Sequence, residues 1–200
     1  MIISEKHKII FIHIHKTAGQ SITDYMKKNL PDSKPFLNKH DFAINGKIAL
    51  GEEKWDEYFK FAFVRNPWDR LVSWYHMFKL KPPVTLLQKY VLDNSKNFEE
   101  FIKKCTDIIV DNDGIKSCAF NQLDYISDEK GKIIIDFIGK LENLEEDFKK
   151  IIEMKKLPKI NLPHLNSYPH KDYKKYYSEE TKEIIKKRFN KDIKFFGYKF

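Results

Sequence analysis

The feature that most constrains this chain is a short apolar segment that runs directly into a loop of small, polar and basic residues. Residues 8–21 read KIIFIHIHKTAGQS, a pattern typical of a strand that ends in a phosphate-sized loop. Lys16 supplies a positive charge, and Gly19 lets backbone amides approach a ligand. Thr17 and Ser21 add hydroxyl donors where the next helix begins. Because Lys16 precedes Gly19, the order differs from a Walker A loop (G-x-x-x-x-G-K-[ST]), and an ordinary ATPase is not the best match.

A second anion site is predicted where another apolar segment meets a helix. Residues 61–73 read FAFVRNPWDRLVS, with Arg65 at the exit of the strand. Asn66 is a favourable N-cap and Pro67 a favourable first helical residue. Ser73 then lies two turns into the helix. A guanidinium fork from Arg65 and the hydroxyl of Ser73 can bind one phosphate together.

The order of strands and helices predicts an α/β fold with a mostly parallel sheet. Ligands of such folds bind at the carboxyl ends of the strands, where both Lys16 and Arg65 fall. The predicted strands cover residues 9–14, 58–64 and 133–138. The predicted helices cover residues 19–29, begin at Asn66, run from residue 144 to a stop near residues 157–158, and begin at Ser178.

Length and charge set broad limits on the class of protein. Two hundred residues with 42% hydrophobic content predict a single domain over residues 1–200. A net charge of +8 indicates an anionic partner, which could be a nucleotide, an acidic glycan, a nucleic acid or a membrane surface. Charge does not choose among them, and a lysine surplus is equally typical of an ordinary solvated face.

The two cysteines and the amino-terminal region indicate a compartment. Cys105 and Cys118 lack CxxC spacing and nearby paired histidines, which argues against a zinc site or a disulfide scaffold. A reducing compartment is the simplest expectation. No apolar stretch is long enough for a signal peptide or a membrane span, so we expect a cytoplasmic chain without an integral membrane segment.

Together the two motifs resemble the sulfotransferases that use 3'-phosphoadenosine 5'-phosphosulfate (PAPS), in particular the carbohydrate branch that includes heparan sulfate 2-O-sulfotransferases and bacterial homologues. The family's 5'-phosphosulfate loop, HxPKTAGTS, matches at His13, Lys16, Thr17, Ala18, Gly19 and Ser21. Its 3'-phosphate motif, RNPxxRxxS, matches at Arg65, Asn66, Pro67, Arg70 and Ser73. Two departures are His15 in place of Pro and Gln20 in place of Thr.

The resemblance implies a P-loop-like three-layer fold, with a central mostly parallel sheet flanked by helices. It implies in-line transfer of a sulfuryl group from PAPS to a carbohydrate hydroxyl, leaving 3',5'-bisphosphoadenosine (PAP), with no metal required. Lys16 would stabilise the leaving phosphate, Ser21 would steer that lysine, and Arg65 with Ser73 would bind the 3'-phosphate. The donor loop would consist of Lys16, Thr17, Ala18, Gly19, Gln20 and Ser21.

His40 is the predicted catalytic base. It lies between the two motifs in residues 38–42 (NKHDF), where the branch resembled here carries its catalytic histidine, and imidazole suits proton transfer at neutral pH. His15 is the rival base, although the charge of the adjacent Lys16 disfavours its protonated form. We expect His13 and His76 to pack within the protein.

Other residues near the motifs are open to two interpretations. Arg70 is expected either to support the phosphate or to bind a carboxylate elsewhere. His164 is a candidate for lining the acceptor cleft. Trp68 and Trp74 are interpreted as core residues rather than as platforms for adenine.

Two other functions compete with sulfuryl transfer. A P-loop nucleotide kinase or phosphotransferase would need an acidic Mg²⁺ ligand at a strand end, where Arg65 places a cation. A basic module that binds an anionic polymer would leave the two phosphate loops unexplained. The expected partner is therefore a carbohydrate acceptor and no nucleic acid, and the oligomeric state is left open.

Overall fold

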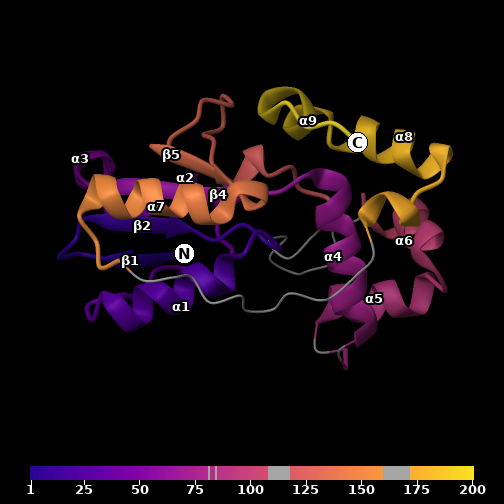
Figure 1. Ribbon diagram of the computed structural model, residues 1–200, viewed down its shortest axis with the longest axis horizontal. Coiled ribbons are helices and arrows are strands. Elements are labelled where there is room, and N and C mark those ends of the chain that lie inside the picture. Colours follow the sequence, from indigo (N-terminus) through magenta and orange to yellow (C-terminus); the bar gives the residue numbers. More distant parts are fainter. Residues whose placement is uncertain (81, 84, 108–117, 160–171) are drawn as a thin grey trace. The chain divides into compact units, whose positions relative to one another are not determined.

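The computed structural model describes residues 1–80, 82–83, 85–107, 118–159 and 172–200 (Figure 1). The chain divides into two compact units. The first consists of Met1–Arg65 and Gln122–Ser167, and the second of Asn66–Asn121 and Tyr168–Phe200. The single domain expected over residues 1–200 stays a prediction.

The first unit is built on a five-stranded sheet in the order β3-β1-β2-β4-β5. Strand β2 pairs in parallel with β4, and β4 pairs in parallel with β5. Because β1 is antiparallel to both β2 and β3, four of the five strands point the same way. The predicted mostly parallel sheet is confirmed. The strands are β1 (Ile2–Ser4), β2 (Ile9–Ile12), β3 (Lys34–Pro35), β4 (Phe59–Val64) and β5 (Phe137–Lys140).

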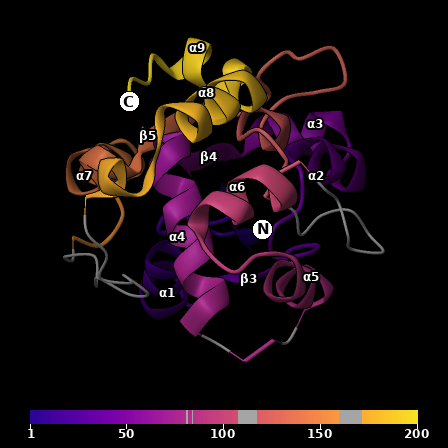
Figure 2. The same cartoon turned by 90° about the vertical axis from the view of Figure 1, so that its right-hand side faces the viewer.

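Helices cover both faces of this sheet (Figure 2). Alternate residues of β4 point to opposite faces, so Phe61 and Phe63 lie on one face and Lys60 on the other. The two phenylalanines share a buried cluster with α1 (Gly19–Asn29) and α7 (Leu144–Lys155). Lys60 contacts Trp55, through a bond from its Nζ to the Trp55 carbonyl oxygen at 3.4 Å. Trp55 belongs to α3 (Glu52–Glu57), which follows α2 (Ala43–Leu50). The result is the predicted three-layer arrangement.

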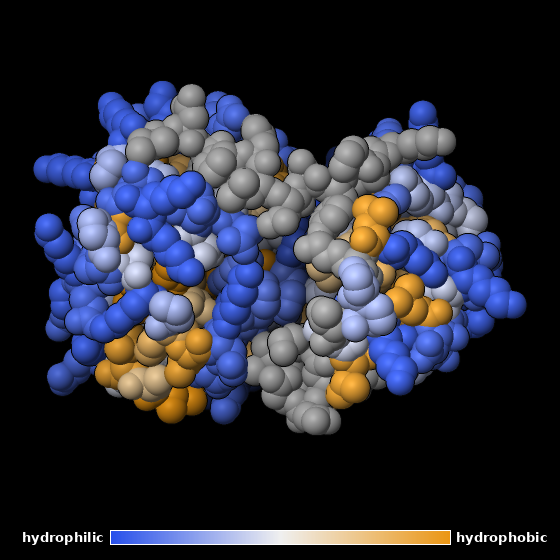
Figure 3. Space-filling model, turned by 90° about the horizontal axis from the view of Figure 1, so that it is seen from below, coloured by the Kyte–Doolittle hydropathy of each residue, from blue (hydrophilic) through white to orange (hydrophobic). Residues whose placement is uncertain are grey.

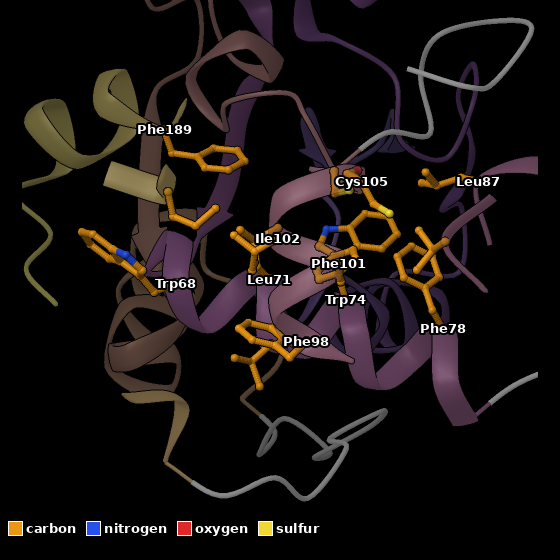
Figure 4. Close-up of a cluster of buried hydrophobic side chains, with 14 residues drawn as sticks. Trp68, Leu71, Trp74, Phe78, Leu87, Phe98, Phe101, Ile102, Cys105 and Phe189 are labelled. Carbon is orange, nitrogen blue, oxygen red and sulfur yellow. Dashed lines mark hydrogen bonds between the residues drawn. The ribbon is translucent and has the colours of Figure 1, made fainter. Parts of the chain in front are cut away.

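Helices and an aromatic core dominate the second unit (Figure 4). Helix α4 (Pro67–Leu80) contributes Trp68, Trp74 and Phe78 to a buried cluster that also contains both cysteines. The two tryptophans are thus core residues, as interpreted from the sequence, and the cysteines are free thiols. The other helices of this unit are α5 (Leu86–Asn94), α6 (Phe98–Cys105), α8 (Glu179–Arg188) and α9 (Asn190–Phe196). Short 3-10 turns lie at Leu123–Tyr125 (η1), Leu141–Asn143 (η2) and Tyr173–Tyr176 (η3).

The predicted elements and the structure differ in the position of one strand, the end of another, and several elements that were not expected. The strand predicted over residues 133–138 is wrong in position, because β5 covers Phe137–Lys140 and Ile133 makes only an isolated bridge with Ser127. Strand β2 ends at Ile12, two residues before its predicted end. Strands β1 and β3 and helices α2, α3, α5, α6 and α9 were not predicted.

Hydrophilic side chains cover much of the face seen in Figure 3, as expected for a chain rich in lysine. In the part of the chain that the structure describes, no helix is both long and apolar enough to cross a membrane. His164, a candidate for the acceptor cleft, lies outside the described residues.

Candidate active site

The loop between β2 and α1 has an unusual backbone. Lys16 and Ala18 have positive φ angles of 67° and 62°, a left-handed conformation that residues other than glycine adopt uncommonly and that is concentrated at functional sites. The Thr17 hydroxyl donates to the carbonyl oxygen of Ile14 at 3.0 Å and closes the turn. Its proton therefore serves the loop rather than a ligand. Ala18 is the N-cap of α1 and has no side-chain oxygen for the first helical amides, which is the arrangement of helix starts that bind anions.

Gly19 packs directly against the ring of His13. A Cβ atom at residue 19 would lie 1.9 Å from Cδ2 and 2.0 Å from Nε2 of the His13 ring. From the sequence, Gly19 was expected to let a ligand approach the backbone. The structure gives a second reason for a glycine here, since any larger residue would collide with the His13 ring. His13 is buried, as expected for a packing residue.

Three imidazole rings meet beside this loop. His40 is half-buried, and its Nδ1 lies 2.8 Å from the carbonyl oxygen of His13. Because a carbonyl oxygen only accepts, Nδ1 carries the proton and the neutral ring has its lone pair on Nε2. The His15 ring stacks on His40 with centroids 3.5 Å apart, and the His13 ring meets it edge-on at 4.4 Å. The structure thus stacks the rings of the two candidate bases, His40 and His15, against each other.

The electrostatics of the cluster favour a neutral ring at His13. Burial holds the pKa of His13 well below its usual value, and the charges of His40 and Lys39 lower it further. Lys39 is exposed and donates from Nζ to Oε1 of Gln20 at 3.0 Å. Gln20, which departs from the family motif, thereby links the start of α1 to the segment that carries His40.

Arg65 lies at the carboxyl end of β4, next to the loop that follows β2. Its Nη1 donates to the carbonyl oxygen of Lys16 at 3.3 Å. The structure therefore brings together two cationic residues that the sequence placed in separate motifs, because β2 and β4 are adjacent parallel strands. Ser21 is buried in the first turn of α1, and its predicted action on Lys16 stays a prediction.

Two residues that sequence reasoning missed hold this site together. Gln122 accepts from the Arg65 amide through Oε1 and donates to the Arg65 carbonyl oxygen through Nε2, both at 2.8 Å. Tyr125 places its hydroxyl 3.3 Å from Nδ1 of His15. Both residues lie far along the chain from their partners, and no motif marks them.

The remaining predicted residues belong to the second unit. Ser73 is buried on α4, and Arg70 is buried and donates from Nη1 to the carbonyl oxygen of Phe120 at 3.1 Å. His76 lies 2.9 Å from the hydroxyl of Tyr176 through its Nε2. Since Arg65 belongs to the first unit, the joint binding of a phosphate by Arg65 and Ser73 stays a prediction. Among the described residues, no three His, Cys, Asp or Glu side chains gather in a way that could hold a metal ion.

A mostly parallel sheet with helices on both faces, a left-handed loop leading into a helix start, and cations at the ends of adjacent strands define an α/β protein of the P-loop-like class. The chain belongs to the sulfotransferase family, whose model matches residues 1–199.

Two relatives show how far the similarity extends. Carbohydrate sulfotransferase 10 of Xenopus laevis is 25% identical over 254 aligned positions, which take in 98% of this chain and 66% of that protein. A protein of Archaeoglobus fulgidus, described as uncharacterized, is 32% identical over 127 residues, or 63% of this chain and 91% of its own length.

Proposed function

We propose that this protein transfers a sulfuryl group from PAPS to a hydroxyl group of a carbohydrate. The observation that carries the proposal is the meeting of Lys16, Arg65 and His40 around one loop of the first unit. Arg65 donates to the carbonyl oxygen of Lys16, and His40 contacts the carbonyl oxygen of His13 in the same segment. Membership of the sulfotransferase family supports the reaction, and the similarity to a carbohydrate sulfotransferase supports the acceptor class.

His40 acts as the general base in this proposal. Its Nε2 accepts the proton of the acceptor hydroxyl while its Nδ1–H stays bonded to the His13 carbonyl oxygen. That bond fixes the tautomer and stabilises the imidazolium that forms, as backbone carbonyl or carboxylate acceptors do for other functional histidines. His15 packs on one face of the ring and limits its motion.

The donor end of the reaction needs positive charge. As the acceptor oxygen bonds to sulfur, the bond from sulfur to the bridging oxygen breaks and negative charge accumulates on the departing phosphate. Lys16 supplies a charge there, and the amides of residues 19 and 20 at the start of α1 bind the 5'-phosphate, since the Ser21 amide donates to the Ala18 carbonyl oxygen at 3.0 Å. Arg65 binds the 3'-phosphate with its planar fork, and the sequence motif assigns Ser73 as its partner.

The first test compares ligands. Calorimetry should show binding of PAP in preference to ATP with Mg²⁺, and Arg65→Ala should weaken PAP binding about tenfold or more, since it removes a charge-assisted contact. Preference for ATP with Mg²⁺ would overturn the proposal in favour of a kinase.

The second test separates binding from turnover. His40→Ala should retain PAP affinity and lose about 10²- to 10⁴-fold in turnover, measured with labelled PAPS and a panel of glycans. His76→Ala, which removes a histidine that contacts Tyr176 in the second unit, is the matched control and should keep its turnover. Normal turnover by His40→Ala would refute the assignment of the base.

A further inference from the structure

The side chain of Gln122 hydrogen-bonds to the backbone just beyond the point where the pairing of β4 with β5 ends. The ladder between β4 and β5 ends at the pair Val64 and Lys140, so Arg65 is the first residue beyond it. Gln122 is fully buried, and its amide makes one bond to the N–H and one to the C=O of Arg65, both at 2.8 Å. Because a side-chain amide carries both an acceptor oxygen and a donor NH₂ group, glutamine can satisfy both backbone groups of a single residue.

Arg65, whose backbone Gln122 binds, also contacts the loop that follows β2. The Arg65 guanidinium donates to the carbonyl oxygen of Lys16, which itself has a left-handed backbone. Three residues after Gln122, Tyr125 contacts His15 of the same loop. A short segment, residues 122–125, therefore braces the end of β4 and the loop after β2 together.

We propose that Gln122 is a positioning residue for donor binding: its amide fixes the backbone of Arg65, so that the guanidinium meets a phosphate of the nucleotide in one orientation. The inference rests on the proposed function, because it assigns to Arg65 a contact with the donor. A bidentate fork depends strongly on its direction, so a small rotation of the Arg65 backbone weakens binding without any loss of charge.

The experiment is a double-mutant cycle with PAP as the probe, measured by calorimetry. Gln122→Met has nearly the same volume and removes both bonds, and it should weaken PAP binding about tenfold. In a protein that already carries Arg65→Ala, Gln122→Met should change PAP affinity less than about twofold. Gln88→Met is the matched control, since Gln88 is also buried and donates from Nε2 to the carbonyl oxygen of Phe78, and it should bind PAP as the wild type does.

The outcomes separate the inference from the proposed function. An equal loss of PAP affinity from Gln122→Met with and without Arg65 would mean that Gln122 acts on the fold in general, and it would overturn the inference. Unchanged PAP affinity in Gln122→Met, while Arg65→Ala weakens binding, would overturn it too. In either case the proposed function would stand. If the wild-type protein fails to bind PAP, the proposed function falls and the inference falls with it. Should Gln122→Met fail to fold, Gln122→Asn, which keeps the amide on a shorter arm, enters the same cycle with the same expected coupling to Arg65.

Discussion

At the scale of single residues, His13 and Gly19 constrain each other. The close approach of the His13 ring leaves no room for a Cβ at residue 19. We predict that Gly19→Ala lowers the free energy of unfolding by about 1–3 kcal/mol, the cost typical of overpacking a buried site, measured by urea denaturation. The double variant His13→Ala, Gly19→Ala should show a coupling that recovers part of this loss. If Gly19→Ala lowers the free energy of unfolding by the same amount in the His13→Ala background as in the wild type, the steric explanation is wrong.

Burial of His13 also predicts a pH dependence of stability. The pKa of His13 lies well below its ordinary value of 6.5 in the folded protein, because burial disfavours the charged ring. Below about pH 6.5 the unfolded chain binds a proton that the native protein does not, so stability falls as the pH drops towards the folded pKa. We predict that from pH 7.5 to 5 the wild type loses up to about 1.4 kcal/mol per pH unit more than His13→Gln. Parallel stability profiles for the two proteins, measured by urea denaturation at several pH values, would refute this.

At the scale of elements, α8 supports the end of α6 through one side chain. Arg188 donates to the carbonyl oxygen of Ile102, to the hydroxyl of Thr106 and to Oδ2 of Asp107. The Ile102 carbonyl lies in the last turn of α6, where a helix end leaves carbonyl groups without intrahelical partners. We predict that Arg188→Met lowers the free energy of unfolding by about 1.5–3 kcal/mol, the usual value for a charged hydrogen bond, measured by thermal and urea unfolding.

The adjacent residue offers the control for this prediction. Lys187 is exposed at the same end of α8, and Lys187→Met should change stability by less than about 0.5 kcal/mol, as is usual for surface positions. Equal losses in the two variants would show that charge at the end of α8 matters, rather than the contacts of Arg188 with α6.

Local signals account for the elements that were predicted correctly. Helix α1 begins and ends as expected, and the starts of α4 and α8 follow from their caps, because the Asn66 side chain accepts from the Trp68 amide and Ser178 forms a capping box with Thr181. Strand β5 was misplaced because residues 133–135 are apolar and branched without being paired in the sheet. Periodicity reports burial, whereas strand limits depend on which partner strand is present.

The candidate site likewise contains residues that local motifs predicted and residues that only nonlocal contacts bring in. The loop at residues 13–21 and Arg65 were predicted, because each motif is contiguous in the sequence. Gln122 and Tyr125 were not, since they contact residues 57 and 110 positions away and carry no local signal. The contact of His40 with the His13 carbonyl oxygen is also nonlocal, and only the resemblance to a family drew attention to His40.

At the scale of the whole molecule, neither compact unit is a continuous stretch of chain. The chain passes between the units after Arg65, after Asn121 and after Ser167, so each unit needs two separate segments to form. The first of these passages occurs where β4 meets α4, without an intervening linker. Flexible, polar linkers are the usual boundaries of independent domains. This interleaving, together with a family model that spans residues 1–199, favours a single cooperative domain.

The three tryptophans allow this to be tested directly. Trp55 lies in the first unit, and Trp68 and Trp74 lie in the second. The tryptophan fluorescence of Trp55→Phe reports only the second unit, and that of the double variant Trp68→Phe, Trp74→Phe reports only the first. We predict that each variant unfolds in urea with a tryptophan-fluorescence midpoint equal to the midpoint from far-UV circular dichroism of the same protein. Coincident transitions by different probes are the mark of two-state unfolding. Because each comparison is made within one variant, any stability lost by removing an indole cancels. Two separated midpoints would show that the units unfold independently and that residues 1–200 are two domains.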